Sequence, residues 1–363
     1  MDDRSSREHR LAELLVGRSL GVQPGWQVMV QATALARPLV EELVRSLARR
    51  GAYPLVRLSF TDLERVPFET VWAEEAPEEL LDEPAAIDVR ARKEVDARVI
   101  LFSAENVYAG SELSSERRLA LRAGARKAID MKADMDMPWV SCPFPTQGLA
   151  QEAGVSLPTY ADILYAACLR DWDAEGERMR RYADRFDAAE TVRIVAPGTD
   201  LTLAIAARSA DVDDGHRNMP GGEFFLCPLE DSAEGVIEFG EYGATYLGRR
   251  CEGIRLRFDS GRIVEASARA GEEHLLAVLD TDDGASRLGE LGIGCNDGIP
   301  RQVQHMWWDE KIAGTIHLAL GQSFPHLGGT NESAIHWDIV KDVAQGRIEL
   351  DGETVQEAGT WLI

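Results

Sequence analysis

The sequence predicts two domains: an α/β N-terminal domain with a mainly parallel sheet, and a mainly antiparallel, barrel-like β domain with helices. Apolar strands alternate with amphipathic helices in the first half of the chain, which is the order typical of βαβ units. Beyond residue 188, short strands of alternating polarity are separated by Pro-Gly, Asp-Gly and Ser-Gly turns. A length of 363 residues also favours two domains, which we place at residues 1–188 and 189–363.

The elements of the first domain follow from apolar periodicity. Leucines at helical spacing, such as Leu39, Leu43 and Leu47, indicate amphipathic helices, and short apolar runs indicate strands. The predicted helices span 8–19, 36–50, 113–127 and 159–190. The predicted strands span 27–31, 53–58, 97–102 and 139–141. No glycine-rich phosphate loop follows any of these strands, so we interpret this domain as a scaffold or a lid.

The second domain begins with short strands at 191–195 and 200–205, and another is predicted at 253–258. Hydrophobic residues make up 45% and charged residues 28% of the chain, which is typical of a soluble globular protein. The formal net charge of -23 argues against nucleic-acid and anionic-membrane partners, because both require a basic surface.

The cysteines and the N-terminus bear on the cellular compartment. Five scattered cysteines without a CxxC pair indicate reduced thiols rather than a disulfide framework. The first ten residues are charged and lack the apolar segment of a signal peptide. No apolar run approaches the length that crosses a membrane. These features predict a cytoplasmic protein.

Two short runs carry histidines at strand spacing. In residues 334–339 polar and apolar residues alternate, so His336 and Asp338 project from one face of a predicted strand. His317 alternates with Ile316 and Leu318 in the same way. An imidazole nitrogen and a carboxylate oxygen are common ligands of divalent metals. We therefore hypothesise one metal site shared by two neighbouring strands; the alternative for His336 and Asp338 is a buried hydrogen-bonded pair.

Three glutamates occupy comparable positions. Glu223 lies in a turn that enters an apolar run, Glu290 lies among glycines and aliphatic residues, and Glu310 precedes a lysine. A buried carboxylate requires a metal or a basic partner, because burial of an unpaired charge is costly. Each glutamate alone is also compatible with a surface turn or a helix cap.

The segments GGEFF, GELGIG, DEKIAGTIHLALG and GGTNESAIHWD follow one another in this order along the second half of the chain. In these segments and their spacings, the chain resembles the metallo-aminopeptidases of the aminopeptidase T / aminopeptidase S family. The resemblance covers most of the chain and is densest between Thr146 and Asp351. It implies two divalent ions, zinc, cobalt or manganese, and a homodimeric assembly. The ligands that it implies are Glu223, Glu290, Glu310, His317, His336 and Asp338, with Glu290 as the bridge.

The resemblance also implies an activity. A bridging hydroxide would attack the scissile carbonyl while one metal polarises the carbonyl oxygen, and the free α-amine of the substrate would bind the other metal. The enzyme would then be a metallo-exopeptidase, an aminopeptidase that hydrolyses N-terminal residues from peptides.

One residue departs from the family pattern. The family has a catalytic tyrosine, which stabilises the oxyanion, where this chain has Phe324. The phenylalanine keeps the ring and lacks the hydroxyl, and His305 or His326 could supply a replacement donor beside an aromatic pocket. We favour the simpler interpretation, in which Trp307 and Trp308 are core residues and both histidines are at the surface.

The missing tyrosine leaves an alternative function open. Dihydroxypyridine ring-cleaving dioxygenases resemble these aminopeptidases and use one Fe(II), for which His317, His336 and Asp338 would form the triad of ligands. Retention of Glu223, Glu290 and Glu310 argues against this alternative, because a single Fe(II) does not need these three carboxylates. A metal-binding protein without efficient catalysis is a third interpretation.

Overall fold

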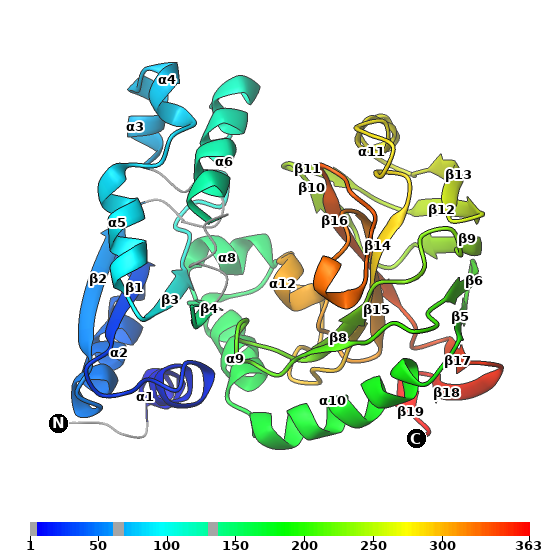
Figure 1. The fold of residues 1–363 in the computed structure, drawn as a ribbon, viewed down its shortest axis with the longest axis horizontal. Coiled ribbons are helices and arrows are strands. Elements are labelled where there is room, and N and C mark those ends of the chain that lie inside the picture. The colour runs from blue at the N-terminus through cyan, green and yellow to red at the C-terminus, as the bar shows by residue number, and fades with distance from the viewer. Residues whose placement is uncertain (1–5, 61–68, 130–136) are drawn as a thin grey trace. The chain divides into compact units, whose positions relative to one another are not determined.

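A computed structural model describes residues 6–60, 69–129 and 137–363. Its contacts divide the chain into two compact units (Figure 1). One unit comprises Met1–Arg170 and Gly215–Gly221, and the other comprises Asp171–Asp214 and Gly222–Ile363. The first contains a parallel sheet and the second contains antiparallel sheets, so the predicted fold class is confirmed. The domain limit after residue 188 stays a prediction.

The first unit is built on a four-stranded parallel sheet with the strand order β2-β1-β3-β4. Its strands are β1 (Gln27–Thr33), β2 (Tyr53–Ser59), β3 (Ala97–Phe102) and β4 (Trp139–Pro143). The central strands β1 and β3 are almost completely buried, whereas the edge strand β2 is exposed. The apolar runs in the sequence therefore located all four strands.

The first unit also contains several helices. They are α1 (Arg7–Glu13), continued by the π-helical η1 (Leu14–Ser19), the short η2 (Ala34–Ala36), α2 (Arg37–Arg49), α3 (Thr70–Glu75), α4 (Glu78–Leu81), α5 (Ala86–Glu94), α6 (Ser115–Ile129), α8 (Gln147–Glu152) and α9 (Leu157–Cys168). Of these, α3, α4 and α6 lie beyond one end of the sheet (Figure 1). Ser6 starts α1, because its hydroxyl oxygen accepts the backbone N–H of His9. Helix α2 buries Leu39, Leu43 and Leu47, as predicted. No helix in the described ranges is long and apolar enough to span a membrane.

Glu13 joins α1 to the end of α2, and we expect this link to depend on pH. Its carboxylate accepts hydrogen bonds from Arg49 at 2.7 Å and Arg50 at 2.9 Å. Burial acts to raise the pKa of Glu13, but the hydrogen bonds from Arg49, Ser46 and Arg50 outweigh it and lower the pKa to about 2. The resulting stabilisation is present above the ordinary pKa of 4.5 and is lost as the pH falls through about 2.

Glu13→Gln is therefore expected to reduce the free energy of unfolding by about 1 kcal/mol at pH 7, a value discounted for the partial exposure of the pair. Denaturant unfolding of both proteins between pH 7 and pH 3 tests this, since the difference should shrink below pH 4.5. The exposed Glu41 offers a control, and Glu41→Gln should change the stability little. A difference that stays constant with pH would contradict the assignment.

The helix predicted over 159–190 is wrong as a single element. It is divided into α9, which ends at Cys168, and α10 (Trp172–Asp187). The side chain of Asp171 accepts the backbone N–H of Ala174 at 3.2 Å and so begins a new helix. The helical periodicity of the segment does not reveal this cap.

The second unit contains two large antiparallel sheets, where the sequence suggested a barrel-like arrangement. The eight-stranded sheet has the order β13-β12-β9-β6-β5-β17-β18-β19, the five-stranded sheet has the order β16-β15-β14-β8-β7, and β10 pairs with β11. The first set of bounds is β5 (Thr191–Ala196), β6 (Thr199–Ala204), β7 (Asp211–Asp213), β8 (Glu223–Leu226), β9 (Glu234–Phe239), β10 (Ala244–Tyr246), β11 (Arg249–Cys251) and β12 (Ile254–Asp259). The remaining strands are β13 (Arg262–Ser267), β14 (Leu288–Gly294), β15 (Thr315–Gly321), β16 (His336–Asp342), β17 (Arg347–Leu350), β18 (Glu353–Glu357) and β19 (Thr360–Trp361).

Besides α10, the second unit has the helices α11 (Glu272–Leu279), α12 (Met306–Asp309) and the short η3 (Pro325–Leu327). One apolar core joins its sheets and helices, with Phe186, Phe224 and Trp337 among its largest members. Strands β14 and β15 are buried along their whole length. Polar side chains on these two strands are therefore held in a rigid, water-poor environment.

Candidate metal centre

The register of the five-stranded sheet brings the predicted site residues onto one face. Residues that lie directly opposite each other on antiparallel strands share a face of the sheet. The paired positions are Glu290 with Ala319 and Ala319 with Asp338, Gly292 with His317, Gly294 with Glu223, and Gly321 with His336. Each polar residue therefore has a glycine or an alanine beside it. The small neighbours leave room for the larger side chains to converge.

Gly292 shows why the neighbours of the polar residues must be small. A Cβ atom at Gly292 would lie 1.9 Å from Cε1 of His317, so the imidazole covers the space that any other residue would fill. A β-bulge between Leu288 and Glu290 shifts the register just where the glutamate projects. The glycines of the segment 289–294 thus place His317 and Glu290 together.

Glu290 lies between the two histidines. Its Oε1 is 3.2 Å from Nε2 of His317, and its Oε2 is 3.3 Å from Nε2 of His336. Nε2 of His336 is also 3.5 Å from Oδ1 of Asp338, and Nε2 of His317 is 3.7 Å from Oε2 of Glu223. The two carboxylate oxygens of Glu290 therefore face different imidazoles.

Glu310 completes the cluster from a different element, since it is the C-terminal cap of α12. Two groups of residues have potential ligand atoms that all lie within 4.8 Å of one another. The groups are Glu223, Glu310 and His317, and Glu290, His317 and Asp338. With His336 beside Glu290, the structure thus brings all six predicted residues together, and the two groups share His317.

Burial changes the protonation of the glutamates on one side of the cluster. Glu223 and Glu310 are 4% and 8% exposed, so neither charge is well hydrated. Burial and the nearby charge of Glu310 raise the pKa of Glu223 to about 7. Burial likewise raises the pKa of Glu310. Both side chains therefore lack sufficient positive charge around them.

On the other side the histidines and carboxylates stabilise one another as ions. Burial acts to lower the pKa of His317, but the hydrogen bond with Glu290 outweighs it and raises the pKa to about 10. Burial acts to raise the pKa of Asp338, but the charge of His336 outweighs it and lowers the pKa to about 2. Burial likewise acts to lower the pKa of His336, but the charge of Asp338 outweighs it and raises the pKa, so the nearby carboxylates favour the charged form of both imidazoles.

His336 is oriented by the backbone. Its Nδ1 lies 2.8 Å from the carbonyl oxygen of Gln322, and a carbonyl can only accept, so Nδ1 carries a proton. When the ring is neutral, its lone pair is therefore on Nε2, which points to Glu290 and Asp338. This hydrogen bond selects the tautomer that a metal ligand requires.

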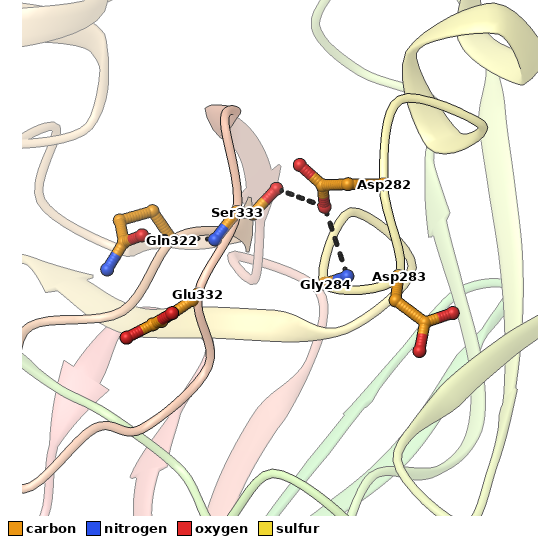
Figure 2. A pocket seen from close by; sticks show the side chains of 6 residues that line it. All are labelled: Asp282, Asp283, Gly284, Gln322, Glu332 and Ser333. Atoms are coloured by element: carbon orange, nitrogen blue, oxygen red, sulfur yellow. Dashed lines mark hydrogen bonds between the residues drawn. The ribbon is translucent and has the colours of Figure 1, made fainter.

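Asp282 and Gln322 both line a surface hollow of about 490 Å³ (Figure 2). Asp282 holds the loop that contains Gln322 through Ser333 and Ala334. Ser333 donates its backbone N–H to Oε1 of Gln322 and its hydroxyl to Asp282, at 3.0 and 2.8 Å. Asp282 also accepts the backbone N–H of Ala334 at 2.7 Å. The walls of the hollow therefore support the loop that orients His336.

Lys311 is a member of the cluster that sequence reasoning missed. It is completely buried, and Nζ contacts Glu223 at 2.5 Å, Glu310 at 2.6 Å and Asp213 at 3.2 Å. The signal that could have revealed it is its position directly after Glu310 in an otherwise apolar segment, where a buried lysine needs a carboxylate partner.

The aromatic residues meet the predictions in part. The Phe324 ring centroid lies 5.3 Å from that of His336 and 5.7 Å from that of His326, so it borders the cluster. Trp308 is fully buried and His326 is exposed, as the favoured interpretation predicted. The surface position expected for His305 is wrong. It is 5% exposed and lies at the start of α12, beside Trp308.

The buried glutamates, aspartate and histidines, most of them on one face of the five-stranded sheet, are typical of a protein that binds divalent metal ions. The chain belongs to the thermophilic metalloprotease (M29) family, whose model matches residues 5–361. It is 26% identical to Aminopeptidase 2 of Geobacillus stearothermophilus, with 97% of each chain covered. It is 28% identical to Aminopeptidase T of Thermus thermophilus, with 99% of this chain and 97% of the relative covered.

A solved structure extends the comparison to three dimensions. Wild-type AmpT from Thermus thermophilus superimposes with a TM-score of 0.84 at 25% identity, over 99% of this chain and 100% of the other. The resemblance seen in the sequence motifs is therefore confirmed. The expected enzyme class, a metallo-exopeptidase, is confirmed as well.

Proposed function

We propose that the protein is an aminopeptidase that uses a dinuclear divalent-metal centre held by Glu223, Glu290, Glu310, His317, His336 and Asp338. The observation that carries the proposal is a set of buried polar atoms directed into the cluster. Oε2 of Glu223 and Oδ1 of Asp338 are buried without a hydrogen-bond partner among the described residues. A buried carboxylate oxygen without a partner is costly, and coordination of a cation would satisfy it.

The six proposed ligands fit two ions. Four carboxylates and two imidazoles exceed what one divalent ion normally takes from a protein, and carboxylate-rich sites favour hard or borderline dications. Glu290 is the proposed bridge, because its two oxygens face different histidines. Zinc, cobalt and manganese are the ions that we propose.

Bound there, the ions would supply a bridging hydroxide as the nucleophile and a Lewis acid for the scissile carbonyl. The residues of the chain would fix the geometry of this reaction. Gln322 keeps the Nδ1 proton of His336 in place, so that Nε2 faces the cluster. Phe324 adds an apolar wall beside His336 but no hydroxyl. If another residue replaces the missing hydroxyl, the exposed His326, whose ring lies against Phe324, is the first candidate and the buried His305 is the second.

The Fe(II) dioxygenase alternative is not favoured. The relatives that match the whole chain are named aminopeptidases. In addition, the glutamates that a single iron does not need, including Glu223 and Glu290, lie in contact with His317. We propose peptides with a free N-terminal amine as the substrates.

We further propose a cytoplasmic homodimer. The five cysteines are buried and include no CxxC pair, which supports a reducing compartment. The dimer is proposed from the sequence resemblance.

Removal and return of metal test the proposal. Protein stripped with a chelator is expected to lose release of amino acids from dipeptides and to regain it with zinc, cobalt or manganese, at about two ions per chain. Dipeptides with an acetylated N-terminus serve as the matched control and should not be cleaved, because they lack the free amine. One iron per chain, with oxygen uptake in the presence of a dihydroxylated heteroaromatic compound, would refute the proposed function.

A further inference from the structure

The ammonium group of Lys311 contacts one carboxylate oxygen of Glu223 and one of Glu310. It is fully buried at the end of α12, and Nζ donates to Oε1 of Glu223 and Oε1 of Glu310. The second oxygen of Glu223, Oε2, is on the side of His317, 3.7 Å from Nε2. That oxygen has no hydrogen-bond partner among the described residues. The lysine therefore occupies one oxygen of each glutamate, and on Glu223 the other oxygen is left for a ligand.

This arrangement limits how the two glutamates can bind an ion. A free carboxylate can bind through one oxygen or through both, and binding through both raises the coordination number. With Oε1 hydrogen-bonded to the ammonium group, Glu223 and Glu310 each favour binding through the other oxygen alone. Glu223, Glu310 and His317 form one of the groups whose ligand atoms lie within 4.8 Å of one another. These three protein ligands, with one water molecule, would suit a four-coordinate ion.

We propose that Lys311 is a positioning residue that determines metal selectivity. By holding one oxygen of Glu223 and one of Glu310, it favours a small ion of low coordination number, such as zinc, over ions that prefer six oxygen-rich ligands, such as manganese. This inference rests on the proposed metal centre.

The formal charges agree with this role. Lys311 contacts three carboxylates, those of Asp213, Glu223 and Glu310, and the cluster adds those of Glu290 and Asp338. These five carboxylates and one ammonium group have a formal charge of -4, which two divalent ions neutralise. The lysine therefore belongs with a two-metal cluster and does not replace one of its ions.

Lys341 provides a matched control. It is also completely buried and lies on β16, the strand that carries His336 and Asp338. Its ammonium group instead contacts Glu241 at 2.6 Å. Replacement of either lysine by methionine removes a buried charge and nearly keeps the length of the side chain. Of these two lysines, Lys311 alone contacts the proposed ligands, so only its replacement should alter the preference among metals.

The experiment compares zinc and manganese on metal-stripped protein, with Kd values measured by competition with a chromophoric chelator. Loss of the positive charge strengthens the attraction for any dication to the same degree, so this effect cancels in the ratio of the two Kd values. Lys311→Met is expected to reduce the preference for zinc over manganese by about tenfold, the scale on which residues that orient metal ligands act. Lys341→Met should leave the ratio unchanged.

Circular dichroism establishes that each variant is folded, and Lys311→Gln, which keeps an amide donor, replaces Lys311→Met if the latter does not fold. An unchanged ratio in the folded Lys311 variant, or an equal change in the Lys341 variant, would overturn the inference. Failure of the wild-type protein to bind either metal would instead refute the proposed function. The two failures are therefore distinguishable.

Discussion

Glu290→Gln is expected to lower peptide hydrolysis at least about 10³-fold and to reduce the bound metal from about two ions per chain to one or none. The substitution keeps the shape of the side chain and removes its charge. One carboxylate oxygen becomes an NH₂ group, which cannot coordinate a cation. Since Oε1 and Oε2 of Glu290 face His317 and His336 respectively, either orientation of the amide disturbs one half of the cluster.

Metal analysis and hydrolysis of a dipeptide by the same preparation check this result. Glu273→Gln is the control, because Glu273 is an exposed residue in α11 of the same unit. It should retain the metal and the activity of the wild-type protein. Two ions per chain together with unchanged turnover in Glu290→Gln would show that this residue is not the bridge.

The convergence of the histidines and Asp338 could be predicted from the sequence, because strand periodicity directly determines which side chains share a face. His336 and Asp338 are two positions apart on β16, and His317 lies on the adjacent β15, so their convergence required only that the two strands pair. The pairing of β14 between β8 and β15 is a long-range property of the fold. The positions of Glu223 and Glu290 were therefore inferred from the family resemblance, not from periodicity.

Features that depend on tertiary packing could not be predicted from sequence periodicity. Lys311 follows Glu310 in the sequence, yet its contacts with Glu223 and Asp213 join residues far apart along the chain. His305 lies between the polar Gln304 and the apolar Met306 in the sequence, and only the fold shows it to be buried. Likewise, the division between α9 and α10 depends on the side chain of Asp171 as a cap, which overrides a continuous helical pattern.

Phe324→Tyr is expected to raise kcat for dipeptide hydrolysis by about 10²-fold, the scale on which a single oxyanion donor acts. The ring of Phe324 borders the cluster, with its centroid 5.3 Å from that of His336. A hydroxyl on this ring would supply the donor that the family's tyrosine provides. Because the donor acts on charge that develops in the transition state, KM should change little.

Phe225→Tyr is the matched control, since the ring of Phe225 lies 5.5 Å from that of Phe324 and gains the same hydroxyl at another position. It should not accelerate the reaction. If Phe324→Tyr also leaves kcat unchanged, then another donor already stabilises the oxyanion. In that case His326→Ala, which removes the imidazole beside Phe324, should lower kcat in the wild-type protein. If Phe324→Tyr does raise kcat, then His326→Ala made in that variant should have little effect, because the new hydroxyl supplies the donor.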